Sequence, residues 1–515
     1  MAAAGSPGTN RSLALTAMIF AVAMTFIDQT IVSIAAPKIQ EKLGLTSTGV
    51  QWAVNSYLLA MAALFALGGK LADTVGQRRM VTIGIVVFAA ASALCGLTPK
   101  GSGAEAWIVA FRALQGAGGA LMYPAALAIV VEAYPPERRG RALALFFGIA
   151  GGLTAVGPAT GGYLVQWTWR SIFWINVPVA VIALVLVARS RPPSVRRPAP
   201  IDYRGLALVV LGVGLSVFGL QQSAQWGWSN PGTGVCIAAG VALLYVLVRV
   251  ELQTATPLIN VRTFRDHLFL IDNVILLIAM TVFIPVFFFA SEYAQISLGD
   301  NAAKASTTLL YFFIGFVAAA QIGGRALDRV GPKRPIVVGC ALACAALILW
   351  AGKVTDLKMG PQVTWIILTG AGLGMMLGQV NTAALNRAPA GTYGEATGIT
   401  QTVRNFGSSI GFAVLGTILV TVFRSDLGDS LVHQGVPTAA AHRTAGSIAQ
   451  LKQGPLATTV QSIPPFVRAD FASATQHVLY VMAGIMGFAC LLALRALPRG
   501  QVATVPAVAP EPAVA

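Results

Sequence analysis

The feature that most constrains this chain is a series of fourteen long apolar stretches. A helix needs about 20 mostly apolar residues to cross the hydrocarbon core of a bilayer, and each stretch is close to that length. Only 10% of the residues are charged, whereas soluble globular chains carry about 25%. The pattern predicts an all-α integral membrane protein. Its fourteen predicted transmembrane helices lie near residues 13–35, 48–69, 80–97, 106–131, 142–164, 171–188, 205–221, 234–250, 268–290, 305–324, 335–351, 363–385, 398–423 and 474–496.

The positive charges indicate how the chain is threaded through the membrane. There are 35 Lys and Arg residues against 19 Asp and Glu, a net charge of +16. Of these 35, 22 lie on the side of the predicted spans that also holds both termini, 11 lie on the other side, and Arg112 and Arg404 fall inside spans. Membrane proteins concentrate Lys and Arg in cytoplasmic loops. We therefore expect a multi-pass protein of the cell membrane with both termini in the cytoplasm. No basic run or DNA-binding motif points to a nucleic-acid partner.

A short motif occurs twice, 255 positions apart. Residues 68–79 read GGKLADTVGQRR and residues 323–334 read GGRALDRVGPKR. Each copy joins two adjacent predicted spans at the cytoplasmic face, so the chain is expected to contain two similar halves of six helices. Internal repeats of this kind build alternating access around a central site in many transporters.

The repeat and the span positions predict how the chain is divided. We expect an N-terminal six-helix bundle, a basic Pro-rich linker, two inserted helices and a C-terminal six-helix bundle, with a cytoplasmic tail at each end. An outer loop within the second bundle is long enough for short helices or a hairpin, and its sequence does not decide between them. In the same order these regions are 12–188, 189–204, 205–250 and 251–497, the tails are 1–11 and 498–515, and the outer loop is 424–472.

The charged residues of the repeat are typical of a conformational latch. Asp73 lies where it can meet a helix N-terminus or the guanidinium of Arg78 or Arg79, both of which stabilise a carboxylate. Such a contact biases the conformation in which it is made. The alternative is a tight loop with solvated charges. The candidate latch residues are Gly69, Asp73, Gly76, Arg78, Arg79, Asp328 and Arg334.

Further motifs accompany the repeat. Residues 69–79 match the loop motif G-x-L-A-D-x-x-G-x-R-R, and the other motifs are IDQTIVSIAAP (27–37), FRALQGAGGALMYPA (111–125), GGLTAVGPATGG (151–162), WRSIFWINVP (169–178) and VRNFGSSIGFAVLGT (403–417). Together they resemble the major facilitator superfamily, specifically its fourteen-helix drug:proton antiporter branch. The resemblance covers nearly the whole chain. It implies two six-helix bundles with two inserted helices, and export of small molecules in exchange for protons.

The resemblance also implies a role for the Gly-rich fifth span. Its residues Gly152, Gly157, Pro158, Gly161 and Gly162 are close to the antiporter motif G-x-x-x-G-P-x-x-G-G. The proline removes one helix hydrogen bond and kinks the helix, while the glycines allow close packing. This face is expected to seal the two halves against leakage, and ordinary helix packing is the alternative.

Charged residues inside the spans are candidates for proton coupling, because a charge at a helix centre costs about 2.5–3.5 kcal/mol. Asp28 and Arg112 lie at similar depths, roughly 12 and 9 Å from the outer ends of their spans, so they are able to face each other. We expect Asp28 to bind the proton and Arg112 to adjust its proton affinity; a permanent structural salt bridge is the alternative. Glu292, at the outer end of the ninth span, and Asp272, near its cytoplasmic end, are further candidate acids.

The substrate site is expected among aromatic and polar residues of the spans. Ligand pockets are mostly apolar with few polar groups, and aromatic faces attract organic cations. The candidate contact residues are Phe26, Tyr57, Gln115, Met122, Tyr123, Phe287 and Asn381. Arg404, in contrast, is expected to hold helices together rather than to contact substrate.

The predicted function is proton-coupled export of small amphipathic compounds, cationic ones among them, by alternating access. The transporter is expected to be a monomer in the lipid bilayer that needs no cofactor or metal, since the five cysteines lie in apolar stretches without a complete ligand set. No catalytic motif indicates an enzyme. The alternatives are a dedicated exporter of one metabolite or antibiotic and, from a different class, a membrane receptor that transports nothing.

Overall fold

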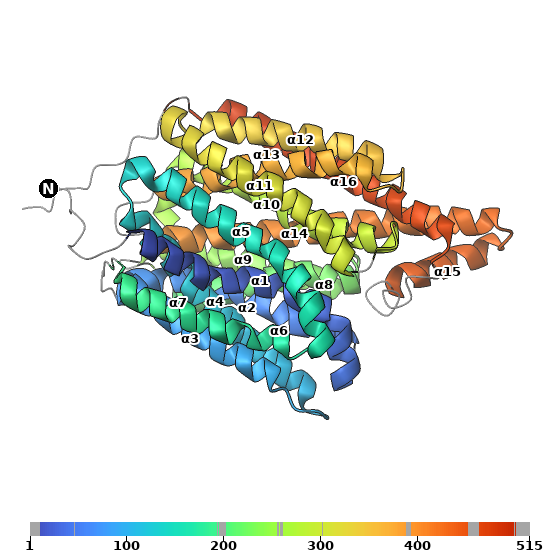
Figure 1. Ribbon diagram of the computed structural model, residues 1–515, viewed down its shortest axis with the longest axis horizontal. Coiled ribbons are helices and arrows are strands. Elements are labelled where there is room, and N and C mark those ends of the chain that lie inside the picture. The colour runs from blue at the N-terminus through green and yellow to red at the C-terminus, as the bar shows by residue number, and fades with distance from the viewer. Residues whose placement is uncertain are drawn as a thin grey trace, which may run out of the picture.

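Long helices run side by side along the whole molecule in the computed structural model (Figure 1). The structure describes residues 11–45, 47–192, 194, 202–254, 257, 261–300, 302–387, 393–451, 463–498 and 500. Within these ranges the regular structure is α-helical, apart from one short 3-10 helix at Val261–Arg265, and no residue lies in a β-strand. The predicted all-α fold class is confirmed.

The helices fall into three sets along the chain. The first set comprises α1 (Arg11–Leu43), α2 (Ser47–Val75), α3 (Gln77–Gly96), α4 (Ala104–Ala133), α5 (Pro136–Trp167), α6 (Ser171–Trp174) and α7 (Asn176–Ser190). The second comprises α8 (Tyr203–Trp226) and α9 (Pro231–Gln253). The third comprises α10 (His267–Ile296), α11 (Ala302–Val330), α12 (Lys333–Val354), α13 (Gly360–Asn386), α14 (Tyr393–His433), α15 (Thr438–Leu451) and α16 (Pro465–Ala496).

The helices account for all fourteen predicted spans. Thirteen stretches in the described part of the chain are long and apolar enough to cross a membrane. The predicted span at 142–164 lies within α5, which has 32 residues and packs beside α1 and α11. Two helix limits differ from the prediction: the sixth span is interrupted at Ile175 between α6 and α7, and α14 continues to His433 instead of ending near 423.

The first and third sets form two bundles, each with its own hydrophobic core; the N-terminal core also takes in a few residues of α10, α13 and α14. The N-terminal core contains Phe65, Phe88 and Met122, and the C-terminal core contains Trp350 and Phe423. The bundles meet where α5 packs against α11 and α2 against α14, and α8 contacts both α2 and α14. Each bundle buries most of its apolar helix faces within itself, which is the arrangement on which alternating access depends in transporters built from repeats.

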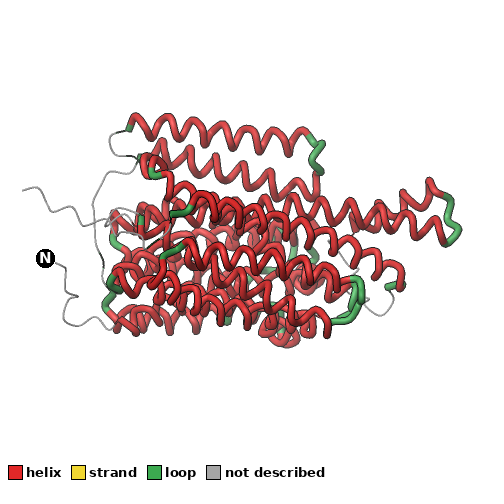
Figure 2. The backbone as a smooth tube through the Cα atoms, turned by 90° about the horizontal axis from the view of Figure 1, so that it is seen from above, coloured by secondary structure: helices red, strands yellow, loops and turns green. Residues whose placement is uncertain are grey.

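A helical hairpin extends beyond the other helices (Figures 1 and 2). It consists of the end of α14 and α15, joined by a turn in which Val436 N donates to Leu431 O at 3.1 Å. Ser430 on α14 also donates to Asp470 of α16 at 3.0 Å. The described part of the predicted outer loop 424–472 is therefore helical. We call this end of the molecule the hairpin end, and the opposite end, where α1 begins, the termini end.

The predicted tails and linker lie largely outside the described residues. Within the linker, α7 ends at Ser190 and α8 starts after Asp202. The Asp202 carboxylate accepts a hydrogen bond from Arg204 N at 2.9 Å, which is the usual N-cap contact of a helix start.

The sequence repeat is also a structural repeat. Gly76 and Gly331 both have positive φ angles, +108° and +81°, which residues other than glycine rarely adopt. Their N–H groups donate to Ala72 O and Leu327 O, each at 3.1 Å. The two copies therefore end α2 and α11 in the same way and turn the chain into α3 and α12.

We expect Gly68→Ala, at the first glycine of the repeat, to destabilise the protein. A Cβ on Gly68 would lie 2.0 Å from the carbonyl oxygen of Ala120 in α4, and a Cβ on the equivalent Gly323 would lie 2.7 Å from Met375 O in α13. The helices would have to separate, and overpacking of this kind costs about 1–3 kcal/mol. The thermal unfolding midpoint of the purified protein in detergent should fall.

Gly352→Ala is the matched control for that substitution. Gly352 lies in α12, and nothing lies within 4 Å of a Cβ added there. Alanine is the better helix former, so this variant should unfold at the wild-type midpoint or above it. Equal midpoints for the two variants would contradict the close approach of α2 and α4.

Candidate functional site

A buried ion pair lies inside the N-terminal bundle. Asp28 on α1 accepts a hydrogen bond from Arg112 on α4, and the side chains are 0% and 1% exposed. These two residues, predicted to lie at similar depths, are in contact in the structure. Charges removed from water are tolerated only when they are paired and their remaining hydrogen-bonding groups are satisfied.

Three further residues complete this pair. Gln115, one turn along α4, donates to Asp28 at 2.9 Å and accepts from Arg112 at 2.8 Å. Arg112 Nε donates to the carbonyl oxygen of Ala53 on α2 at 2.9 Å, and its guanidinium lies 4.4 Å from the centre of the Tyr57 ring. Most contacts of the guanidinium are thus with neutral groups, which would still hold it if the carboxylate became protonated. We call these five residues the carboxylate cluster.

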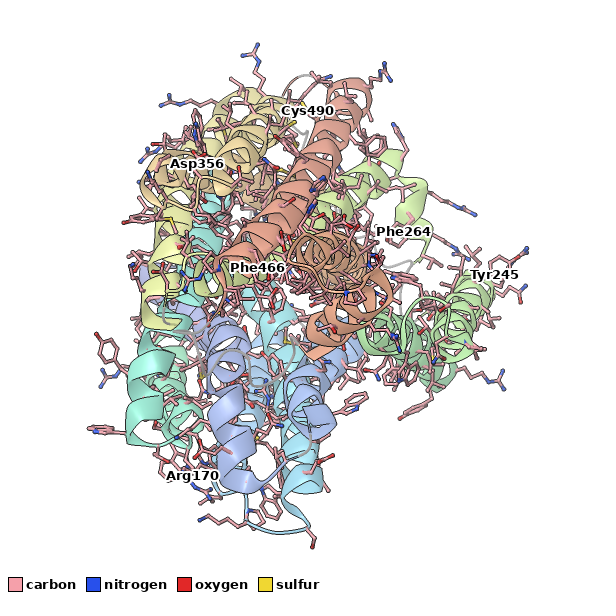
Figure 3. All side chains as sticks on the ribbon, turned by 90° about the vertical axis from the view of Figure 1, so that its right-hand side faces the viewer. Arg170, Tyr245, Phe264, Asp356, Phe466 and Cys490 are labelled. Atoms are coloured by element: carbon pink, nitrogen blue, oxygen red, sulfur yellow. The ribbon has the colours of Figure 1, made fainter. Side chains whose placement is uncertain are left out.

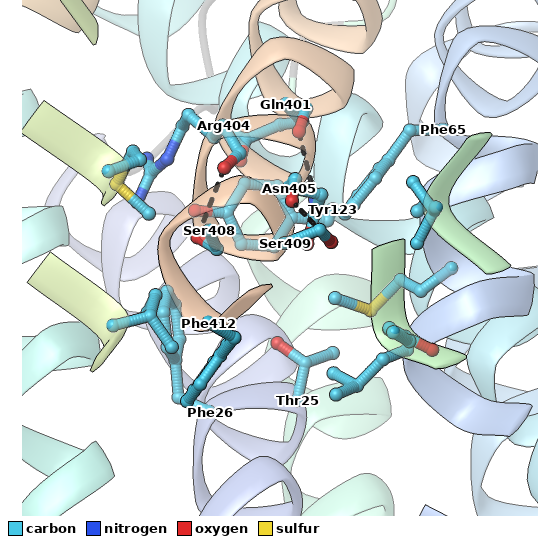
Figure 4. A pocket seen from close by; sticks show the side chains of 17 residues that line it. Thr25, Phe26, Phe65, Tyr123, Gln401, Arg404, Asn405, Ser408, Ser409 and Phe412 are labelled. Carbon is cyan, nitrogen blue, oxygen red and sulfur yellow. Dashed lines mark hydrogen bonds between the residues drawn. The ribbon is translucent and has the colours of Figure 1, made fainter. Parts of the chain in front are cut away.

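A pocket lies between the two bundles (Figure 4). Its cavity volume is about 90 Å³. The lining residues come from α1, α2, α4, α8, α10 and α14, so both halves of the repeat contribute. They are Thr25, Phe26, Leu58, Met61, Ala62, Phe65, Tyr123, Val217, Gln221, Met280, Ile284, Gln401, Arg404, Asn405, Ser408, Ser409 and Phe412.

One contact joins the cluster to the pocket. The Tyr57 hydroxyl, whose ring lies under Arg112, donates to the carbonyl oxygen of Thr25 at 3.3 Å. Thr25 lines the pocket and precedes Asp28 by three residues, so the two lie on the same face of α1. The Tyr57 side chain thus links the guanidinium of Arg112 to the main chain of a pocket residue.

The predicted substrate residues fall into three groups. Phe26 and Tyr123 line the pocket, with ring centres 5.9 Å apart. Tyr57 and Gln115 belong to the carboxylate cluster instead. The remaining three lie elsewhere: Met122 packs on α3 near Gly84, Phe287 belongs to a group of phenylalanines on α10 and α11, and Asn381 is buried in α13 with no hydrogen-bond partner for its amide atoms.

The other candidate acids lie at opposite ends of α10. Asp272 forms a second buried pair, with Arg387 at the end of α13; the distance is 2.8 Å and the side chains are 0% and 7% exposed. Glu292 is half-buried near the hairpin end of the same helix. Neither contacts the pocket between the bundles. Each bundle therefore contains a buried carboxylate–guanidinium pair.

The candidate latch residues differ in their surroundings. Asp73 is buried next to the turn at Gly76, while Arg79 and Arg334 are exposed. The backbone N–H of Arg78 donates to Ser194 in the linker at 3.4 Å. The corresponding Asp328 is half-buried, and Gly69 is buried within α2.

The antiporter motif lies on the helix that joins the two bundles. Gly157 and Gly161 are buried, and a Cβ on Gly161 would lie 2.7 Å from the Ile31 side chain of α1. Toward the termini end, Gly148 of the same helix faces Gln321 of α11. Gly152, Pro158 and Gly162 lie in α5, but their surroundings are outside the described part of the chain.

Sequence reasoning missed most of the contribution of α14 to the pocket. Six of its residues line the cavity: Gln401, Arg404, Asn405, Ser408, Ser409 and Phe412. Arg404, expected only to hold helices together, is one of them. The signal is present in the sequence, because these positions recur at intervals of three and one, which places them on one helix face. Five polar residues on a face of a membrane helix indicate a surface turned toward a cavity.

A metal centre finds no support in the described residues, where no three His, Cys, Asp or Glu side chains lie together. Comparisons with known proteins instead match transporters. Residues 18–412 fit the family model of the Major Facilitator Superfamily. The chain is 35% identical over 410 residues to the tetracenomycin C resistance and export protein of Streptomyces glaucescens, covering 79% of this chain and 76% of that protein.

Two further similarities agree with this match. The multidrug resistance protein Stp of Mycobacterium tuberculosis is 31% identical over 406 residues, which cover 77% of this chain and 73% of that protein. The solved structure of the xylose transporter XylE from E. coli shares the fold, with a TM-score of 0.55, 13% identity, and coverage of 95% of this chain and 99% of that chain. The chain therefore belongs to the Major Facilitator Superfamily and is a multi-pass membrane transporter, not an enzyme.

Proposed function

We propose that this transporter exports small amphipathic compounds in exchange for protons, with Asp28 as the residue that binds the proton. The carboxylate cluster next to the inter-bundle pocket carries the proposal. Relatives named for tetracenomycin C export and for multidrug resistance support the direction of transport. We further propose that the protein acts as a monomer in the cell membrane, with both termini in the cytoplasm.

Protonation of Asp28 supplies the step that couples the two fluxes. In the charged state the Asp28 carboxylate accepts hydrogen bonds from two residues of α4, Arg112 and Gln115. A proton on Asp28 removes the ionic part of this contact while the guanidinium keeps Ala53 O, Gln115 and the Tyr57 ring. Arg112 then shifts toward these neutral partners, and the Tyr57–Thr25 hydrogen bond passes the shift to the pocket. Bound substrate and bound proton therefore stabilise different arrangements of the pocket wall at Thr25.

In this proposal the described conformation is closed at the termini end. Just beyond Gln401 toward that end, α14 meets α2 so closely that a Cβ on Gly398 would lie 2.9 Å from Phe65 O. Under the proposed orientation this closes the pocket toward the cytoplasm. The loop motif around Asp73 and Asp328 lies at the same end and acts in the proposal as the latch that holds this closure.

Transport by purified protein in vesicles with an imposed pH gradient tests the proposal. Fluorescent amphipathic compounds should accumulate against their gradient only while the pH gradient exists, and adding them should release protons that a trapped pH dye reports. A proton falling through 100 mV releases about 2.3 kcal/mol, enough for roughly 50-fold accumulation. Accumulation that survives a protonophore would contradict proton coupling. A panel of unrelated compounds separates a multidrug exporter from a dedicated one.

The second buried acid, Asp272, is the alternative proton site. Its pair with Arg387 lies at the end of α10 near the termini end, away from the pocket. We expect Asp272→Asn to leave accumulation driven by the pH gradient in place. Measured in the same vesicles, loss of accumulation in this variant would move the proton site to the C-terminal bundle.

A further inference from the structure

The electrostatic character of the pocket identifies the kind of substrate it suits. Among its 17 lining residues one is ionised, the guanidinium of Arg404, and none is an acid. A guanidinium stays charged at any pH the protein meets. The carboxylate of Asp28 is paired with Arg112 and does not line the pocket. A cation entering the pocket would meet repulsion in a low-dielectric environment, where charges interact strongly.

The hydrogen-bonding groups of the pocket also favour a substrate that accepts hydrogen bonds. The Tyr123 hydroxyl and the Gln401 amide are buried in the lining next to Arg404, and the side chains of Arg404 and Gln401 interact with that hydroxyl. Other polar groups already donate to their own helices: Ser408 to Arg404 O at 3.1 Å and Asn405 to Gln401 O at 2.8 Å (Figure 4). Hydrogen-bond donors of Tyr123, Gln401 and Arg404 therefore gather beside the positive charge, where a substrate acceptor can bind them.

The rest of the lining suits a flat ring system. The rings of Phe26 and Phe65 lie 5.9 and 5.8 Å from the Tyr123 ring, and Phe412 lies on the facing helix. Met61 and Met280 add unbranched side chains that adapt to varied shapes. Aromatic rings gain most from offset or edge contacts with another planar ring.

We propose that the exported compounds are planar aromatic molecules with an acidic or strongly hydrogen-bond-accepting edge, such as a phenolate, and that Arg404 and the Tyr123 hydroxyl bind that edge. This inference rests on the proposed export function and specifies its substrate class. It differs from the expectation based on aromatic faces alone, which includes organic cations. The cavity of about 90 Å³ is smaller than the 300–1,000 Å³ of typical ligand pockets, so binding requires the bundles to separate around it.

Two probes of matched size and opposite charge test the proposal. Resorufin is a planar three-ring phenolate, and proflavine is a planar three-ring cation. Purified full-length protein should bind resorufin at least 10-fold more tightly in detergent, by fluorescence anisotropy, and vesicles with a pH gradient should accumulate resorufin in preference. Equal affinities, or preference for proflavine, would overturn the substrate class.

Substitution of Arg404 separates binding from a merely structural role. Arg404→Gln should weaken resorufin binding about 10-fold or more and strengthen proflavine binding, while Arg404→Lys should retain part of the preference. Arg424→Gln removes an exposed charge from the same helix and should change neither affinity. Equal losses for both probes in Arg404→Gln would assign Arg404 to helix packing and overturn the proposal.

The two proposals fail in distinguishable ways. If resorufin binds with the expected charge preference but moves without regard to the pH gradient, the substrate class stands and proton antiport fails. If proflavine accumulates with the pH gradient and resorufin neither binds nor moves, antiport stands and the substrate class fails. Membrane potential adds a further readout, because exchange of an anion for one proton moves two charges. For each net charge moved, a membrane potential of 100 mV changes the highest substrate concentration ratio that the transporter can maintain about 50-fold. One-for-one exchange of a cation for a proton moves no net charge, so membrane potential should not change that ratio.

Discussion

Asp28→Asn should abolish accumulation driven by the pH gradient while leaving exchange of substrate for substrate in place. The amide is nearly the same size as the carboxylate and keeps a hydrogen-bonding contact with Gln115, but it has no proton to take up or release at physiological pH. With a gradient worth 100 mV, the accumulation ratio should fall from roughly 50-fold to about 1. Counterflow of labelled substrate needs only the alternating pocket and should continue.

Glu41→Gln is the matched control for this variant. Glu41 lies on the same helix α1, is exposed, and pairs with Lys38 at 3.0 Å and Lys42 at 3.3 Å. Removing its charge should leave both accumulation and counterflow at wild-type levels. If Asp28→Asn still accumulates substrate with the pH gradient, Asp28 is not the proton site. If the variant loses counterflow together with accumulation, the ion pair has a structural role instead.

The sequence was sufficient to place the carboxylate cluster approximately. Apolar length predicted the spans, and counting residues from their ends put Asp28 and Arg112 at similar depth. The intermediate groups were harder to assign. Gln115 and Tyr57 were recognised as intramembrane polar residues, but span positions do not say which of them points toward the ion pair and which toward a ligand. That choice depends on how α1, α2 and α4 rotate about their own axes when they pack.

The pocket was less accessible to sequence reasoning because it forms between the halves. Phe26 and Tyr123 were among the candidates, whereas the polar face of α14 was not assembled from its individual residues. Arg404 was interpreted alone, as a charge near the end of a span, although Gln401, Asn405 and Ser408 share its helix face. Reading that face as a unit would have indicated the cavity. Which helix of the other bundle it meets follows only from the packing of α14 on α2.

The repeat shows where sequence and structure agree most directly. A glycine with positive φ leaves little freedom for substitution, so Gly76 and Gly331 mark the same turn in both halves. The lengths of helices outside the membrane are less constrained by hydropathy. The end of α14 and the whole of α15 are moderately polar, and no membrane thickness limits them, so the outer loop gave no prediction of its helical hairpin.

Removal of one member of the buried pair should destabilise the fold far more than removal of both. Asp28→Asn leaves a guanidinium that cannot lose its charge, and Arg112→Gln leaves a carboxylate with only Gln115 as a partner. Breaking a buried ion pair costs about 3–5 kcal/mol. Arg112→Gln should reach that range, whereas Asp28→Asn should lie at or below its lower end, because Ala53 O, Gln115 and the Tyr57 ring still hold the guanidinium. The double variant Asp28→Asn, Arg112→Gln buries no net charge and should recover most of that loss. Thermal unfolding midpoints in detergent compare all three variants with the wild type.

An exposed ion pair is the matched control for this cycle. Lys353 and Asp356 in and just after α12 lie 3.7 Å apart, with side chains 50% and 44% exposed. Surface pairs contribute about 0–1 kcal/mol, so Lys353→Gln and Asp356→Asn should shift the midpoint little, singly or together. If the Asp28 and Arg112 substitutions were additive, the two charges would be independent of each other. A proton on Asp28 would then change nothing at Arg112, and the coupling between proton and pocket would lose its physical basis.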